Sequence, residues 1–164
     1  MSDAFLSRAD DDDGTVLEQD FAASDRSSGA AVNPTHTTDE RLDFFVTRDG
    51  LTFAGTHLII DLYGAKRLDD PAHIEEVLVR AAREAGATVL SADFHHFTPN
   101  GGVSGVVVLS ESHISIHTWP ERDFAALDVF MCGDCRPIDT LATFKEAFEP
   151  ERIGVNELRR GVVS

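Results

Sequence analysis

The sequence contains, at residues 102–121, the stretch GVSGVVVLSESHISIHTWPE, which reads as two strands joined by a short polar connection. An apolar run over 104–109 predicts the first strand, and residues 114–118 predict the second. Polar and apolar side chains alternate along the second strand, in the order His113, Ile114, Ser115, Ile116 and His117. Successive side chains of a strand point to opposite faces, so one face is apolar and the other carries histidine and serine. The pattern predicts an antiparallel sheet that is buried on one face.

Further elements extend on both sides of this pair. Apolar and β-branched residues cluster between turn signals at four more expected strands: 56–63, 87–97, 125–131 and 153–157. Helices are predicted where apolar residues recur at helical spacing: from a cap at Asp69 or Asp70 to Gly86, and over 137–148. The order β-α-β-β-β-β-α-β predicts an α+β fold, a two-layer sandwich of a mainly antiparallel sheet with two helices on one face.

The first 43 residues differ in kind from the rest. They hold 11 acidic and 3 basic residues, including four consecutive aspartates at 10–13, and show no sustained strand or helix period. Such a segment buries too little apolar surface to offset the entropy that is lost on ordering. We therefore predict a disordered acidic tail over residues 1–43 and a folded domain over 44–164. A short docking motif at Phe44 and Phe45 is the alternative for the end of the tail.

Composition narrows the class of protein. The chain has 164 residues, 42% of them apolar, which suits one folded domain. Acidic residues outnumber basic ones by 29 to 14, and the formal charge of −15 opposes binding to nucleic acid. No apolar run approaches the roughly 20 residues that cross a bilayer, and the first residues lack the basic and apolar regions of a signal peptide. We expect a cytoplasmic protein with no nucleic-acid or membrane partner.

Reactive side chains are concentrated over residues 110–121 and at Cys132 and Cys135. Histidine and serine on the open face of a sheet either form a solvated surface or line a pocket. The cysteines form a C-x-x-C pattern, which is typical of a redox pair or of half a zinc site. We expect no metal, because zinc needs two further ligands, which the histidines of the chain would have to supply.

Residues 102–121 resemble the processing segment of bacterial and archaeal S-adenosylmethionine decarboxylases. The resemblance runs in order from about Gly55 to Gly161 and leaves the acidic tail outside. It includes three further motifs: Gly86-Ala87-Thr88, Phe94-His95-His96-Phe97 and ALDVFMCG at 126–133. The resemblance implies an S-adenosylmethionine decarboxylase-like fold.

The resemblance also implies a self-cleaving proenzyme. Members of the family cut themselves before a serine, which becomes a pyruvoyl group, their covalent cofactor. In this chain the cut would lie between Glu111 and Ser112, after attack of the serine hydroxyl on the preceding carbonyl. A β chain would then comprise residues 1–111 and an α chain residues 112–164.

Three more catalytic roles follow from the resemblance. His117 is the processing base, which suits histidine because its ordinary pKa lies near neutrality. Ser104 supplies a hydroxyl that assists processing. Cys132, which follows Ser112 by 20 residues, is the proton donor after carbon dioxide leaves.

The resemblance further assigns a substrate site. Phe97 and Trp119 would stack on adenine, and Glu121 would accept hydrogen bonds from the ribose hydroxyls. Aromatic faces also suit a nearby sulfonium cation. The structural alternatives are core packing for the two aromatic residues and a solvated turn position for Glu121.

These assignments predict a homodimer of αβ units that decarboxylates S-adenosylmethionine to the aminopropyl donor for spermidine and other polyamines. One alternative is a same-fold pyruvoyl-dependent arginine or ornithine decarboxylase, although a small amino acid needs no stacking slot. A second alternative is an uncleaved, non-enzymatic partner or metal-binding subunit.

The spacing of Ser112 and His117 adds a geometric expectation. The two residues are five positions apart, so in one regular strand they would point to opposite faces. We therefore expect Glu111 and Ser112 to lie off the strand ladder, in an irregular connection between the two strands.

Overall fold

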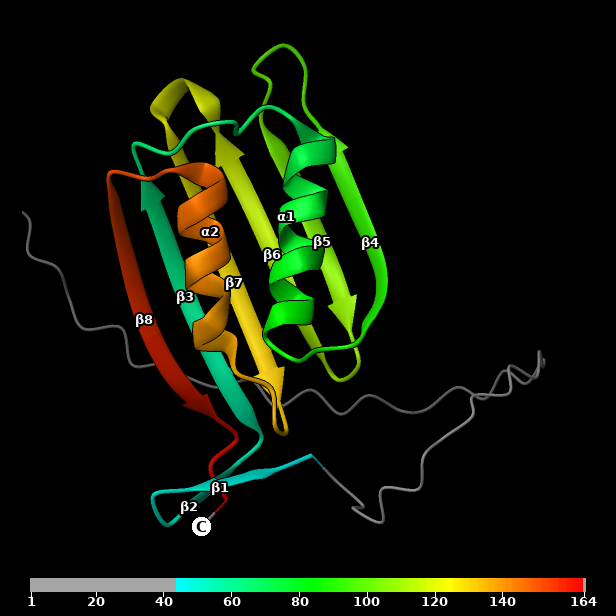
Figure 1. Ribbon diagram of the computed structural model, residues 1–164, viewed down its shortest axis with the longest axis vertical. Helices are drawn as coiled ribbons and strands as arrows, with labels where there is room; N and C mark the ends of the chain where they lie inside the picture. The colour runs from blue at the N-terminus through cyan, green and yellow to red at the C-terminus, as the bar shows by residue number, and fades with distance from the viewer. Residues whose placement is uncertain (1–43, 164) are drawn as a thin grey trace, which may run out of the picture. The chain divides into compact units, whose positions relative to one another are not determined.

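Antiparallel pairing joins six strands into one sheet, in the order β4-β5-β6-β7-β3-β8, and two more into a hairpin, β1-β2 (Figure 1). The computed structural model describes residues 44–163. The strands are β1 Val46–Arg48, β2 Leu51–Phe53, β3 Gly55–Tyr63, β4 Val89–His96, β5 Val103–Leu109, β6 Ser112–Trp119, β7 Phe124–Cys132 and β8 Arg152–Arg160. The helices are α1 Pro71–Glu84 and α2 Thr140–Phe148, with short 3-10 turns at η1 Pro120–Arg122 and η2 Pro137–Asp139.

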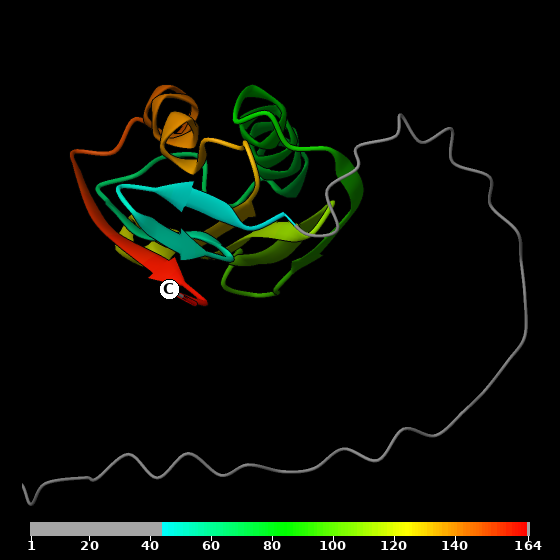
Figure 2. The same cartoon turned by 90° about the horizontal axis from the view of Figure 1, so that it is seen from below.

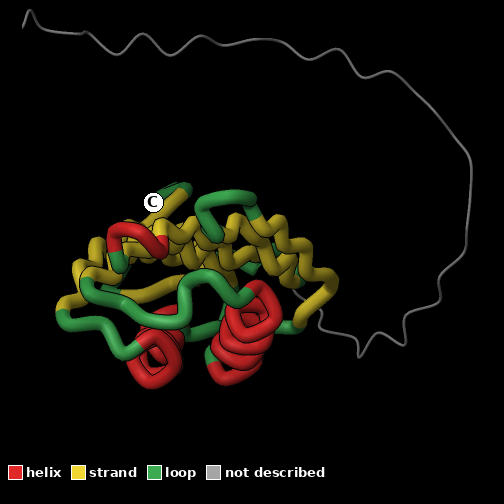
Figure 3. Tube along the Cα trace, turned by 90° about the horizontal axis from the view of Figure 1, so that it is seen from above, coloured by secondary structure: helices red, strands yellow, loops and turns green. Residues whose placement is uncertain are grey.

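Both α-helices pack against the same face of the six-stranded sheet (Figures 2 and 3). The side chains between the two layers form the buried core, which includes Leu58, Ile60, Leu62, Ile74, Leu78, Ile114, Ile116, Leu127, Phe144 and Phe148. Alternation in the sequence therefore identified the buried side of β6 correctly. The predicted α+β fold, a two-layer sandwich with both helices on one face, is confirmed.

The helix boundaries follow from local chemistry. The side chain of Asp70 accepts a hydrogen bond from the backbone N–H of His73 at 3.1 Å, which caps the first turn of α1. The same helix ends before Gly86, whose φ of +86° lies in the region that favours glycine. The second expected helix is divided, because it begins as the 3-10 turn η2 and becomes α-helical in α2.

One expectation about the connection between β5 and β6 is wrong. Ser112 lies on the ladder, where it pairs with Leu109 of β5. Only Ser110 and Glu111 form the connection, and Glu111 has a φ of +60°. The physical reason is that a two-residue turn closes the hairpin, so strand pairing resumes at the next residue. The β1-β2 hairpin is a further element without a counterpart among the expected strands.

A buried hydroxyl fixes the far end of the β5-β6 pair. Thr118 donates a hydrogen bond to the carbonyl of Leu68 at 2.7 Å and accepts one from the N–H of Val103 at 2.8 Å. A side chain at Gly102 would place its Cβ 2.8 Å from the carbonyl oxygen of Thr118, so the close approach of the strands needs glycine there. These contacts hold the start of β5 and the end of β6 in a fixed register.

The first described residue, Phe44, is bonded through its backbone to the residue that follows β7. The carbonyl of Phe44 accepts a hydrogen bond from Gly133 at 3.0 Å. The predicted acidic tail, residues 1–43, lies outside the described residues. Within 44–163, no helix is long and apolar enough to cross a bilayer.

Substitution of Gly105 tests the packing of β4 on β5. An alanine Cβ at this position would come within 2.0 Å of the Phe94 ring, which packs against the core. Relief of this clash must displace the ring, so we expect Gly105→Ala to lower the free energy of unfolding by about 1–3 kcal/mol. Urea titration in a Ser112→Ala background measures the change on a chain that cannot be cut at Ser112.

Gly154→Ala is the matched control, because its Cβ would have no neighbour closer than 3.6 Å. Equal unfolding midpoints for the two alanine variants would contradict the packing argument.

Candidate active site

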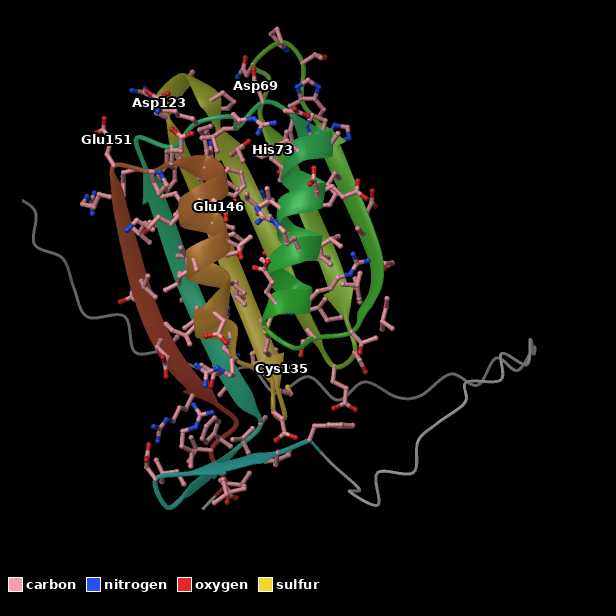
Figure 4. All side chains as sticks on the ribbon, in the orientation of Figure 1. Asp69, His73, Asp123, Cys135, Glu146 and Glu151 are labelled. Carbon is pink, nitrogen blue, oxygen red and sulfur yellow. The ribbon has the colours of Figure 1, made fainter. Side chains whose placement is uncertain are left out.

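Strand β6 carries reactive side chains at both of its ends. Ser112 stands at its first residue, after the turn from β5, and His117 stands near its last, before η1 (Figure 1). Five residues of extended strand separate them by roughly 16 Å. Figure 4 marks the two ends of the sheet by labelled residues, with Cys135 near the end where β6 begins and Asp123 near the end where it finishes. The predicted site residues therefore form two groups within one chain.

The first group surrounds the predicted cleavage bond. The backbone N–H of Cys132 donates a hydrogen bond to Ser112 Oγ at 3.2 Å. The thiol of the same cysteine donates to the carbonyl oxygen of Glu111 at 3.3 Å. Cys132 ends β7, and this strand brings it beside Ser112 although 20 residues separate the two. One residue thus contacts both sides of the Glu111–Ser112 peptide bond.

A cavity of about 430 Å³ opens at this end of the sheet. Its lining includes Phe44, Ser110, Glu111, Cys132, Gly133 and Cys135. Sequence reasoning did not place Phe44 here, because its position depends on the hydrogen bond from Gly133, 89 residues away in the sequence. The cavity gives a small molecule access to the Cys132 thiol.

Burial controls the protonation of Cys132. Desolvation raises the pKa of its thiol above the ordinary value, the negative charge of Glu111 raises it further, and the hydrogen bond with Ser112 opposes both effects. At neutral pH the sulfur therefore keeps its proton. A protonated thiol suits a proton donor better than a nucleophile, which must be a thiolate.

The second group lies at the opposite end of β6. Ser104 and His117 are direct partners in the β5-β6 ladder, and Ser104 Oγ lies 2.8 Å from His117 Nδ1, within hydrogen-bonding distance. Both side chains project from the face that the helices leave uncovered. A serine bonded to Nδ1 fixes the orientation of the imidazole ring.

An aromatic cavity of about 210 Å³ adjoins this pair. Phe97, Trp119 and Glu121 line it together with Ser104 and His117. The exposed fractions of Phe97 and Trp119 are 47% and 41%, so neither is a core residue of this chain, and the core-packing alternative is wrong. Glu121 occupies the first turn of η1 at the rim.

The loop that carries Phe97 is closed by its own backbone. Phe97 donates an N–H to the carbonyl of Gly102 at 2.8 Å and accepts one from Gly101 at 2.9 Å. Asn100, within this loop, also lines the aromatic cavity, as does Thr118. Neither was a candidate from sequence, although a threonine among the buried positions of β6 is a signal that its hydroxyl must be bonded.

Between the two groups, the uncovered face carries a histidine network. Arg160 donates to His57 Nδ1 at 3.1 Å, so the other nitrogen, Nε2, bears the proton and donates to Asp128 at 3.0 Å. Burial lowers the pKa of the neighbouring His113, and the proximity of His57 lowers it further. No group of three or more candidate metal ligands occurs among residues 44–163.

Known proteins resemble this chain in sequence. A family model described as S-adenosylmethionine decarboxylase matches residues 56–161. The S-adenosylmethionine decarboxylase proenzyme of Methanococcus maripaludis is 47% identical over 112 residues, which cover 66% of this chain and 91% of that protein. The proenzyme of Moorella thermoacetica is 46% identical over 112 residues, covering 66% of this chain and 89% of that protein.

A solved structure extends the likeness to three dimensions. The adenosylmethionine decarboxylase of Aquifex aeolicus superposes with a TM-score of 0.60 at 34% sequence identity, over 68% of this chain and 94% of that one. The fold likeness that residues 102–121 implied is therefore confirmed. From the family match and the relatives together, the chain belongs to the S-adenosylmethionine decarboxylase family.

Proposed function

We propose that the chain is a proenzyme that cleaves itself between Glu111 and Ser112 and then decarboxylates S-adenosylmethionine. The observation that carries this proposal is the contact of the protonated Cys132 thiol with the Glu111 carbonyl, one bond from Ser112. The proenzyme names of its relatives support the same reaction, and the chain spans about nine-tenths of their length. The product would serve as the aminopropyl donor for spermidine synthesis.

The geometry suits the first step of cleavage. Ser112 Oγ attacks the carbonyl carbon of Glu111, and the hydrogen bond from Cys132 stabilises the negative charge that develops on the carbonyl oxygen. Glu111 is held in the left-handed region at a φ of +60°, which costs a non-glycine residue on the order of 1 kcal/mol or more and weakens the reactant peptide. The product of this step is an ester that joins the Glu111 carbonyl to Ser112 Oγ.

A base completes the cleavage. It removes the α-proton of Ser112, the ester bond breaks by β-elimination, and Glu111 leaves as a free carboxylate. The dehydroalanine that remains adds water and loses ammonia to give the pyruvoyl group. Ser112 fits this group, because its side chain lies against Cys132, which lines the cavity, and the serine itself supplies every atom of the pyruvoyl group except the oxygen that comes from water.

His117 is the proposed base, and we place it on a second copy of the chain. With Nδ1–H donating to Ser104, its Nε2 keeps a lone pair that can accept a proton. The roughly 16 Å of strand between Ser112 and His117 rules out contact within one regular strand. A two-fold axis perpendicular to β6 reverses the strand direction of the partner, so the end of each chain that carries His117 lies next to the end of the other chain that carries Ser112.

The uncovered face of the sheet supports this dimer. It presents Ile59, Val108 and Leu158, whose exposed fractions are 38%, 39% and 45%. On the same face His57, Asp128 and Arg160 are already hydrogen-bonded to one another, so these contacts persist when the face is covered. The complete site would then be assembled from the two groups of residues on opposite subunits.

Each cavity would bind a different part of the substrate: the aromatic cavity the nucleoside, and the cavity beside Cys132 the amino-acid part. Phe97 and Trp119 are both exposed and line one cavity, where their rings can stack on adenine, and Glu121 can accept hydrogen bonds from the ribose hydroxyls. The pyruvoyl group supplies a carbonyl that condenses with the substrate amine and withdraws the electrons released with carbon dioxide. Cys132, which keeps its proton, delivers it to the former α-carbon. The aromatic cavity disfavours the arginine or ornithine alternative.

The mass of the denatured protein tests self-cleavage. We expect two fragments, 1–111 and 112–164. The second should be lighter, by the mass of one ammonia, than the same fragment with serine at its first residue. Ser112→Ala should remain one intact, folded chain because it lacks the attacking hydroxyl. An uncut wild-type chain would instead indicate a non-enzymatic partner.

Complementation between two inactive variants tests the shared site. Ser112→Ala and His117→Ala should each remain uncut when expressed alone. When they are expressed together, the mixed dimer holds one site with both Ser112 and His117, so the His117→Ala chain should be cut and the Ser112→Ala chain should not. Mass spectrometry separates the two chains. If no chain is cut in the mixture while both variants fold and associate, the shared site is wrong.

Replacement of Cys132 separates cleavage from decarboxylation. Cys132→Ser keeps a hydrogen-bond donor for the Glu111 carbonyl but makes a much weaker acid. We expect it to self-cleave and to lose about 100-fold or more in kcat with S-adenosylmethionine. Cys135→Ser makes the same replacement of sulfur by oxygen three residues away, and this variant should keep its activity. A fully active Cys132→Ser would remove the proton-donor assignment.

A further inference from the structure

The two cysteines of the chain stand on either side of a two-residue turn. Cys132 ends β7, Gly133 and Asp134 form the turn, and Cys135 follows it. Gly133 has a φ of +61°, a conformation that glycine adopts without strain. The first and fourth Cα atoms of such a turn lie within about 7 Å of each other, and bridged cysteines have Cα atoms about 4.4–6.8 Å apart. A turn of this length can therefore bring the pair into the range of a disulfide bond.

Both thiols are free, and both line the cavity of about 430 Å³ beside Glu111. Their surroundings hold the turn in place: the Gly133 N–H bonds to Phe44, and the Arg136 N–H bonds to the Ala85 carbonyl at 2.9 Å. Each cysteine is half-buried, so small molecules in the cavity reach the sulfurs. The function proposed above uses Cys132 and leaves the C-x-x-C pairing unexplained.

We infer that Cys132 and Cys135 form a thiol–disulfide exchange site, at which a small-molecule disulfide oxidises the pair to an intramolecular disulfide. One cysteine thiolate attacks the reagent, RSSR, forms a mixed disulfide and releases one RS⁻. The second cysteine, as its thiolate, attacks the mixed disulfide at the protein sulfur and releases the second RS⁻. The protein pair loses two electrons and two protons, and RSSR gains them as two RSH molecules.

Burial limits the rate of this exchange and predicts its pH dependence. Desolvation raises the pKa of both thiols, and the negative charge of Glu111 adds to the effect at Cys132 and that of Asp134 at Cys135. Only the thiolate attacks, and its fraction grows as pH rises toward these raised values. The exchange should therefore accelerate roughly tenfold for each pH unit up to that range.

The consequence for the enzyme rests on the function proposed above. A disulfide sulfur carries no proton, so oxidised Cys132 can neither donate to the Glu111 carbonyl nor protonate the product carbon. Rotation of its sulfur toward Cys135 also removes it from the end of the cavity next to Ser112. The oxidised protein should be folded, processed and inactive, and a dithiol reductant should restore it.

Intact mass tests the site without reliance on activity. The two cysteines are the only ones in the sequence, and both lie in the 112–164 fragment. Reduced, processed enzyme is treated with bis(2-hydroxyethyl) disulfide, denatured and alkylated with N-ethylmaleimide. We expect this fragment to be lighter by two hydrogen atoms and to take up no maleimide, with decarboxylation lowered at least about tenfold and recovered after dithiothreitol.

Cys135→Ser is the matched control. It cannot close the disulfide, so its Cys132 should remain as a mixed disulfide, heavier by one mercaptoethanol group. A wild-type fragment that carries mixed disulfides or two free thiols after the same treatment overturns the inference. A closed disulfide with unchanged decarboxylation overturns its effect on activity and the role of Cys132. If no sample decarboxylates S-adenosylmethionine, the proposed function fails while the thiol measurement still decides the exchange site.

Discussion

Strand β6 is hydrogen-bonded on both sides, to β5 and to β7, and this double pairing fixes the distance between Ser112 and His117. A strand held in two ladders cannot fold back on itself, so the cleavage bond and its proposed base stay at opposite ends. The same pairing fixes the contacts within each half of the site. Pairing with β7 places Cys132 in contact with Glu111, and pairing with β5 places Ser104 in contact with His117. The chemistry proposed here therefore depends on a second chain, because one chain cannot supply both halves.

Much of this arrangement is predictable from local patterns. Alternation along 113–117 separates the buried side of β6 from the side that carries histidine and serine, and burial of Ile114 and Ile116 bears this out. The helix over 71–84 follows from a capping aspartate, regular apolar spacing and a terminal glycine. Each of these features is determined by neighbours within a few residues, which is why one sequence is enough to locate them.

The features that sequence does not reveal depend on distant pairings. The hairpin β1-β2 consists of two three-residue strands, too short to show a period. Ser112 lies on the ladder because the turn before it has only two residues, and the length of a turn cannot be read from polarity. The network of His57, Asp128 and Arg160 joins three strands that are remote in sequence, so register alone creates it.

The strand order decides how the two fragments of the proposed cleavage would be arranged. Strands β3, β4 and β5 belong to the first fragment and β6, β7 and β8 to the second, so the fragments interleave across the sheet. Three of the five ladders, β5-β6, β7-β3 and β3-β8, join one fragment to the other. The fragments would therefore remain associated without a covalent link, but unfolding would separate them, and refolding would become a bimolecular event that slows on dilution. The lifetime of such an enzyme would depend on its rate of unfolding, because the two fragments would lack the peptide bond that joins β5 to β6 during the first folding.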